Sequence, residues 1–166
     1  GTLACAWRRS TGAALPCIIL FSKRNSGGVM GDEVMRSNDG CPIEPAVRTI
    51  AMPADTNPAG DIFGGWLMAQ MDLAAGNAAA RRARGRCATV AVDGMVFHRP
   101  VSVGDEVSLY AIIEHIGRTS MKIHVEAWRR SRFDEARFKV TEALFTFVAI
   151  DENGRPRAIP PADTQE

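Results

Sequence analysis

Apolar and polar residues alternate along much of the second half of the chain. The clearest stretch, residues 121–127, reads Met-Lys-Ile-His-Val-Glu-Ala. Alternation with a period of two is typical of a β-strand with one dry face and one wetter face. Three neighbouring stretches are enriched in β-branched and aromatic residues. We therefore predict four strands, at residues 87–97, 107–116, 121–130 and 138–150.

The middle of the chain has a different pattern. Residues 64–83 contain no proline and are rich in Ala, Leu and Met, which predicts one helix about 30 Å long. A short strand is predicted at residues 47–51, closed by Pro53, and residues 55–60 form a loop before the helix.

The element order is therefore one strand, one long helix and four strands. Because short connections favour antiparallel neighbours, we expect the last four strands to form a meander. Curling that sheet around the mostly apolar helix is the simplest way to bury it, so the fold class is α+β. A chain of 166 residues buries roughly 70% of its unfolded surface, which is enough for one domain.

The first 43 residues lack this regular patterning, and we predict that they form a loosely ordered extension of the domain at residues 44–160, with 161–166 as a tail. The apolar run at 15–21 is far shorter than the roughly 20 residues of a membrane span. No small-residue cleavage site clearly follows this run. We therefore expect no membrane partner.

Charge and cysteine content exclude several other classes. The 20 basic and 19 acidic residues nearly cancel, and the basic residues form no stripe, which argues against a nucleic-acid partner. The four cysteines are widely spaced and form no C-x-x-C pair, so we expect neither disulfides nor a structural metal. A reducing compartment, the cytoplasm, fits this pattern best.

Asp72 lies in the middle of the predicted helix, in the part that the sheet should cover, where a carboxylate is costly. Its neighbours at helical spacing are all small, so this face could admit a thin ligand or another backbone. The alternative is that Asp72 lies at the end of the covered stripe and faces water or a partner subunit. The small neighbours are Gly65, Ala69, Ala75, Gly76 and Ala79.

The helix begins with Gly64 and Gly65, and Asp61 lies three residues before Gly64. Glycines leave the first helical N–H groups unobstructed, and these free donors with the helix dipole suit an oxyanion or a phosphate. The alternative is a tight turn that needs positive φ, and both interpretations can hold together. The spacing matches neither a dinucleotide-binding fingerprint nor a P-loop.

These residues belong to a wider set of motifs between residues 48 and 160. The set resembles the hotdog-fold acyl-CoA thioesterases of the bacterial YciA type. This resemblance implies a helix wrapped by a curved antiparallel sheet, a dimer with a continuous sheet as the active unit, and further assembly into a hexamer. The motifs are NPAGDIFGGW at 57–66, MD at 71–72, VAVD at 90–93, FHRPVSVGD at 97–105, GRTS at 117–120 and FTFVA at 145–149.

The resemblance also implies hydrolysis of acyl-CoA to a free acid and coenzyme A, with Asp72 as the catalytic carboxylate. The N–H groups near Gly64 and Gly65 would polarise the carbonyl, while Asp72 activates water or attacks directly. The leaving thiol has a pKa near that of free cysteine, about 8.5, so it departs with little help from an acid. Asp61 matches a family position close to the thioester.

The turn Arg118, Thr119 and Ser120 resembles the family segment that contacts the nucleotide end of coenzyme A. An Arg suits a phosphate because its fork bonds two oxygens at once. The alternative for Arg118 is a solvated turn residue. Asn57 and Arg99 are weaker candidates for the same substrate, and we expect no cofactor beyond the coenzyme A of substrate and product.

Two other functions use the same scaffold. A hotdog hydratase or dehydratase normally pairs a loop His with a helix carboxylate, but the loop before this helix offers Asp61 and no His. A non-catalytic acyl-CoA sensor would keep the pocket without needing Asp72. His115 and His124 flank one turn and could pair across strands, yet no third metal ligand is evident, and Cys87 is more typical of a small buried hydrophobe than of a nucleophile.

Overall fold

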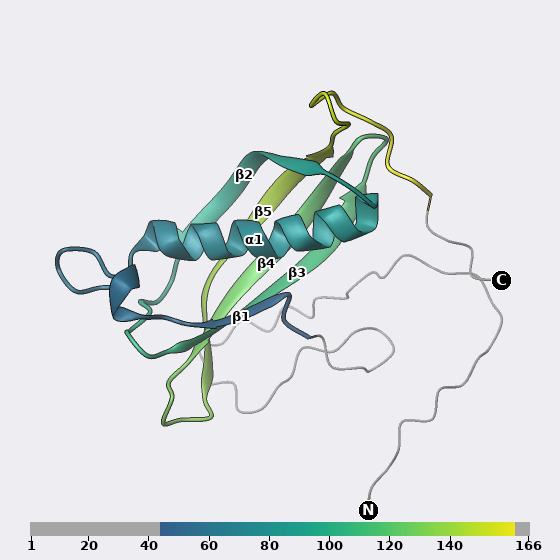
Figure 1. The fold of residues 1–166 in the computed structure, drawn as a ribbon. Coiled ribbons are helices and arrows are strands. Elements are labelled where there is room, and N and C mark those ends of the chain that lie inside the picture. The colour runs from purple at the N-terminus through teal and green to yellow at the C-terminus, as the bar shows by residue number, and fades with distance from the viewer. Residues whose placement is uncertain (1–43, 162–166) are drawn as a thin grey trace, which may run out of the picture.

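A computed structural model describes residues 44–161 of the chain (Figure 1). The predicted N-terminal extension, and all but the first residue of the predicted C-terminal tail, lie outside the described residues. Within the described part, no helix is both long enough and apolar enough to cross a membrane.

The predicted elements are confirmed, with strand ends that differ by at most one residue. The helix has both predicted ends, and Arg84 stops it by adopting a left-handed conformation with φ of 51°. The elements are β1 (Val47–Ile50), the 3-10 turn η1 (Pro53–Asp55), α1 (Gly64–Ala83), β2 (Cys87–Phe97), β3 (Glu106–Ile116), β4 (Ser120–Arg130) and β5 (Arg137–Ala149).

The five strands form one antiparallel sheet in the order β1-β3-β4-β5-β2. β3, β4 and β5 form the predicted meander, but the prediction that β2 continues it was wrong. β1 pairs along the free edge of β3, so the only edge left for β2 is that of β5. The connection at residues 98–105 is long enough to cross the end of the sheet. The rule that short connections join neighbouring strands therefore does not apply to β2 and β3.

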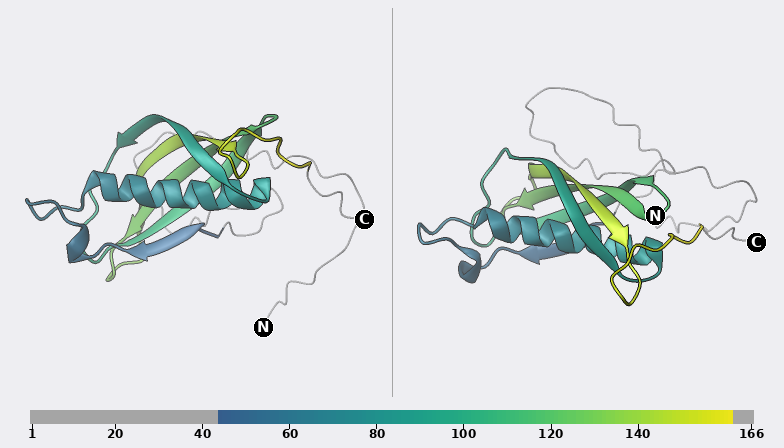
Figure 2. Two further views of the ribbon diagram at one scale, coloured as in Figure 1. Left: turned by 45° about the horizontal axis from the view of Figure 1, so that its top comes forward. Right: turned by 90° about the horizontal axis from the view of Figure 1, so that it is seen from above.

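The helix lies across one face of the curved sheet, as the views in Figure 2 show. Its buried stripe repeats at helical spacing and is made mostly of alanine, so the helix backbone can approach the sheet closely. Phe145 and Phe147 on β5 fill the space that these small side chains leave. The buried stripe is Leu67, Met71, Ala74, Ala75, Ala79 and Ala83.

The other face of the sheet carries a charged cluster that the strand pattern did not predict. Glu126 was expected on the wetter face of its strand, yet it is fully buried. Lys139 donates to the Glu126 carboxylate at 2.6 Å and to Glu142 at 2.5 Å, and the Trp128 indole donates to Glu126 at 2.9 Å. Burial is tolerated because the carboxylate accepts two hydrogen bonds, one of them from the Lys139 cation.

Lys139 and Glu142 also titrate differently from free side chains. Burial opposes the charge on Lys139, but its hydrogen bonds to the two carboxylates outweigh burial and raise its pKa. Burial likewise works to raise the pKa of Glu142, but Lys139 and His124 outweigh it, so this pKa lies below the ordinary value. The stability that Glu142 contributes is therefore present near neutral pH and is lost as the pH falls through its lowered pKa.

We expect Lys139→Met to lower the free energy of unfolding by about 3 kcal/mol, because it leaves the Glu126 carboxylate buried without a cation. Lys139 also lowers the pKa of Glu142, so this variant should lose part of the stability that the parent gains as the pH rises above that lowered pKa. Urea denaturation from pH 3 to pH 8 measures both effects. The double variant Lys139→Met/Glu126→Gln should recover most of the loss, and equal instability of the two variants would contradict this account.

Candidate active site

Asp72 lies at the margin of the buried stripe of α1, on the side of β2. Met71 and Ala75 beside it are fully buried, whereas Leu73 is 60% exposed, and Asp72 itself is half-buried. The Thr89 hydroxyl on β2 donates to Oδ1 of Asp72 at 2.6 Å. No cation within residues 44–161 pairs with this carboxylate. The expectation that the sheet covers Asp72 was therefore wrong, and the alternative, the end of the covered stripe, is correct.

The small residues around Asp72 do not form one open face. Ala75 and Ala79 are buried against the sheet, and the space beside Gly76 is taken by the Phe147 ring, which would lie 3.6 Å from an added Cβ. Gly65 and Ala69, toward the start of the helix, remain at least partly exposed. The open part of this face therefore runs from Asp72 toward the N-terminus of α1.

The start of α1 leaves backbone donors free, as predicted. Phe63, the N-cap, makes no side-chain capping bond, and the first paired helical amide is that of Trp66, which donates to the Phe63 carbonyl at 2.9 Å. Among the described residues, the amides of Gly64 and Gly65 have no acceptor. Neither glycine has positive φ, so the tight-turn alternative was wrong. Gly65 instead leaves room for the Phe63 ring, which an added Cβ would strike.

The loop before the helix is held by Asn57 and presents Asp61. The side-chain oxygen of Asn57 accepts from the amides of Ala59 at 2.9 Å and Asp61 at 3.1 Å. The backbone N–H of Asn57 in turn donates to the Asp61 carbonyl at 2.8 Å. The Asp61 side chain is exposed and has no partner within residues 44–161. Asn57 thus fixes the loop that carries Asp61.

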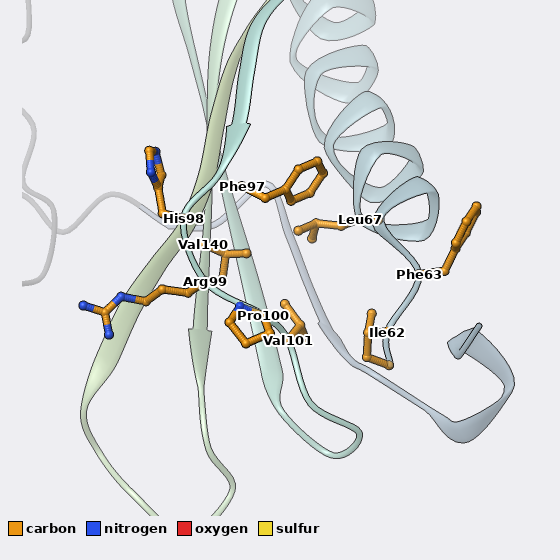
Figure 3. Close-up of a pocket in the computed structure, with 10 residues that line it drawn as sticks. Ile62, Phe63, Leu67, Phe97, His98, Arg99, Pro100, Val101 and Val140 are labelled. Carbon is orange, nitrogen blue, oxygen red and sulfur yellow. The ribbon is translucent and has the colours of Figure 1, made fainter. Parts of the chain in front are cut away.

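An apolar cavity of about 330 Å³ opens beside Gly64. Figure 3 shows Leu67, Phe97 and Val140 pointing into the space between the helix start and the 98–105 connection, whereas His98 and Arg99 point away from it. Sequence reasoning missed these lining residues. Their apolar character was visible, but nothing local distinguishes a cavity wall from ordinary core.

The predicted coenzyme A residues lie at opposite ends of α1 in one chain. The turn of Arg118, Thr119 and Ser120 lies near the helix C-terminus (Figure 1), where the Ile159 amide donates to the Arg118 carbonyl at 2.9 Å. Arg99 lies near the helix N-terminus, with its guanidinium 4.8 Å from the centre of the Phe138 ring. The structure does not bring Arg99 and Arg118 together.

The histidines differ from their predicted arrangement. His115 lies opposite Lys122 and His124 lies opposite Ile112, so the two do not pair. His124 instead has two acidic neighbours that the sequence did not indicate, because Glu126 and Glu142 offer oxygens within 4.8 Å. Lys139, however, already supplies the positive charge between those carboxylates.

Cys87 is half-buried at the start of β2, and its thiol lies 3.7 Å from the Gly85 carbonyl. Burial raises the pKa of this thiol, and the positive charge of Arg157 offsets that only in part. A raised pKa disfavours the thiolate, which is the nucleophilic form. This supports the interpretation of Cys87 as structural.

Comparison with known proteins gives consistent matches. Residues 59–133 match the family model described as the thioesterase superfamily. An uncharacterized acyl-CoA thioester hydrolase, ZMO0511 of Zymomonas mobilis, is 54% identical over 136 residues, which are 80% of this chain and 91% of that protein. The acyl-CoA thioester hydrolase YciA of Escherichia coli is 53% identical over 117 residues, 69% of this chain and 89% of that protein.

Solved structures give the same result. The crystal structure of HI0827, a hexameric broad specificity acyl-coenzyme A thioesterase, superposes with a TM-score of 0.70 at 46% identity, covering 79% of this chain and 92% of that one. An acyl-CoA hydrolase from Staphylococcus aureus, in complex with butyryl coenzyme A and coenzyme A, gives 0.64 at 30% identity, covering 70% and 73%. A hexameric hotdog fold thioesterase of Campylobacter jejuni superposes with a TM-score of 0.66 at 38% identity, covering 70% of this chain and 90% of that one, which confirms the hotdog fold.

The raised pKa of Cys87 predicts slow alkylation at neutral pH. In a Cys5→Ser/Cys17→Ser/Cys41→Ser background, the rate of iodoacetamide labelling should still be rising at pH 9, because the thiolate is not yet the main form. Mass spectrometry of quenched samples measures the rate, with free cysteine as the reference. Labelling that reaches its plateau below pH 8 would contradict the structural interpretation.

Proposed function

Because the chain belongs to the thioesterase superfamily, we propose that Asp72 and the free amides at the start of α1 carry its reaction. The chain is an acyl-CoA thioester hydrolase, which converts acyl-CoA and water to a free acid and coenzyme A. The observation that carries the residue assignment is the state of Asp72, which is held by Thr89, half-exposed and without a cation partner in the described part of the chain. Such a carboxylate remains available to the substrate.

Asp72 acts on the thioester as a general base or as a nucleophile. As a base it takes a proton from water while the water oxygen bonds to the carbonyl carbon. As a nucleophile its own oxygen bonds to that carbon, and water later cleaves the mixed anhydride. Thr89 occupies Oδ1, so Oδ2 is the atom free to act in either route.

The amides of Gly64 and Gly65 receive the negative charge that develops on the carbonyl oxygen. Donors fixed before the reaction cost no reorganisation, and the positive end of the helix dipole adds to their effect. The C–S bond then breaks, and coenzyme A departs as a thiolate that water protonates. These groups suffice for the reaction, and coenzyme A enters only as part of the substrate.

The geometry of α1 supports a site that is shared by two chains. Asp72 lies seven positions after Gly65, which is about 10 Å along the helix axis. Each helical N–H points toward the N-terminus, so the free amides point away from Asp72 of their own chain. A carbonyl bound to these amides therefore meets Asp72 of a second copy, with Asp61 nearby in the loop.

Strand β2 provides the surface for that second copy. It is an edge strand, and four of its apolar side chains are exposed, as are Met68 and Leu73 on α1 beside it. Antiparallel pairing of two β2 edges continues the sheet and covers this apolar surface. We propose this dimer as the active unit and, by likeness to the hexameric relatives, three dimers per assembly. The exposed β2 side chains are Val90, Val92, Val96 and Phe97.

The same pairing of β2 edges provides contacts for the coenzyme A phosphates and for the acyl chain of the substrate. It brings the helix start of one chain toward the helix C-terminal end of the other, where Arg118 is exposed to meet the phosphates of coenzyme A. The cavity beside Gly64 offers an apolar wall to the acyl chain. We place the enzyme in the cytoplasm, where isolated thiols such as Cys87 stay reduced.

Asp72→Asn should lower kcat for acyl-CoA hydrolysis by about 10²- to 10⁴-fold, because the amide can neither accept a proton nor attack. Release of free thiol, followed with a thiol reagent, measures the rate, while thermal melting and sedimentation check fold and assembly. Asp134→Asn, in the exposed β4–β5 hairpin, is the matched control and should retain full activity. Near-parental turnover in the Asp72 variant would refute the assignment.

Gly64→Pro should lower kcat by about 10²-fold, since it deletes one donor to the oxyanion. Proline is tolerated at the first helical position, and Phe63 already has the extended conformation that a residue before proline needs. Gly64→Ala keeps the N–H, and its Cβ would meet Phe97 only at an ordinary 3.6 Å. It should therefore stay close to the parent in the same thiol-release assay.

Mixing these two inactive variants tests whether the site is shared. When equal amounts of Asp72→Asn and Gly64→Pro chains re-form dimers, half of the dimers contain one chain of each kind. Each mixed dimer has one intact site out of two, so activity should return to about a quarter of the parental value. Mild denaturation and refolding of the mixture allows the exchange. If both groups of a site came from one chain, no activity would return.

A further inference from the structure

The segment that follows β5 returns to the end of α1 and is fixed there by Arg157. After a turn at residues 151–154, the Arg157 amide donates to the Ala149 carbonyl at 2.8 Å. The Arg157 side chain then reaches the last residue of the helix, donating from Nη2 to the Ala83 carbonyl at 2.8 Å. Its Nε donates to the Ile150 carbonyl at 3.1 Å.

Arg157 therefore joins the helix end and the segment through one planar group. Carbonyls in the last turn of a helix have no intrahelical partner, and a cation there also complements the helix dipole. The neighbouring position is shaped for this group, because a Cβ at Gly85 would lie 2.6 Å from Nη2 of Arg157. Arg82 adds a second tie by donating to the Pro160 carbonyl at 2.7 Å.

The same segment holds the turn of Arg118. Two residues beyond Arg157, the Ile159 amide donates to the Arg118 carbonyl at 2.9 Å, and the Ile159 side chain packs against the core. The Ala149 amide, which precedes the segment, donates to the Thr119 carbonyl at 2.8 Å. A continuous series of contacts thus runs from Ala83 through Arg157 and Ile159 to Arg118.

We propose that Arg157 is a positioning residue, which sets the place of the Arg118 turn relative to α1 and thereby the binding of the nucleotide end of coenzyme A. The inference rests on the proposed function, in which Arg118 meets the phosphates and Asp72 acts from α1. Arg157 itself touches neither the phosphates nor the thioester. Its loss should therefore weaken substrate binding through the nucleotide and leave the chemical step unchanged.

The test compares two thioesters of one acid, butyryl-CoA and butyryl-N-acetylcysteamine, of which the second lacks the nucleotide. Arg157→Gln should raise KM for butyryl-CoA about tenfold, with kcat within about twofold, which corresponds to losing one well-placed charged contact. Its kcat/KM for butyryl-N-acetylcysteamine should equal that of the parent. Arg155→Gln is the matched control, because Arg155 is exposed in the same segment and, within residues 44–161, bonds only through its backbone.

Further variants separate this inference from the function on which it rests. Arg118→Gln should raise KM for butyryl-CoA by itself, and Arg118→Gln/Arg157→Gln should be no worse than Arg118→Gln, since both act through one contact. Arg157→Lys, which keeps the charge but not the planar fork, should give an intermediate KM and guards against a variant that does not fold.

Three results would overturn the positioning role. The first is an equal loss of kcat/KM by Arg157→Gln on both thioesters, which indicates only a structural role. The second is a parental KM in Arg157→Gln while Arg118→Gln is impaired, which leaves the proposed function intact. The third is a parental KM for butyryl-CoA in Arg118→Gln, which removes the coenzyme A turn and the inference together. Failure of the parent protein to hydrolyse either thioester would refute the proposed function itself.

Discussion

The direction of the backbone amides at the start of α1 is the constraint on which the proposed site depends. An α-helix aligns its N–H groups toward the N-terminus, so the free donors of Gly64 and Gly65 face out of the helix end. Asp72 lies on the other side of these donors, two turns into the same helix. The two groups proposed for thioester hydrolysis therefore lie apart within one chain, and the dimer proposed through β2 would bring them together.

The packing of α1 determines how Asp72 is presented. Alanine fills most of the buried stripe, so the helix lies close to the sheet. The Phe147 ring occupies the space beside Gly76. A carboxylate inside that contact would be desolvated at considerable cost. At the margin Asp72 stays half-exposed, and a single hydroxyl, that of Thr89, fixes its orientation.

Charged groups elsewhere in the domain stabilise the framework around the site. Glu126 is fully buried but has Lys139 and Trp128 as partners, and this cluster lies on the sheet face opposite the helix. Arg157 caps the helix at the end farthest from its free amides. One end of α1 is thus closed by a guanidinium, while the amides at the other end have no acceptor among the described residues, in agreement with the polarity of the helix dipole.

The sequence by itself determined the helix, all five strands and the residues available for the chemistry. Proline-free alanine-rich stretches and two-residue alternation are local signals, and the start of α1 at Gly64 with unhindered amides follows from local sequence as well. Tertiary structure alone decided that β2 lies beside β5, that Asp72 is at the margin of the core, that Lys139 neutralises Glu126, and that Arg99 and Arg118 lie at opposite ends of α1. These features depend on which strand edges remain free and on which distant side chains meet, and such contacts between remote residues leave no periodic pattern in the chain.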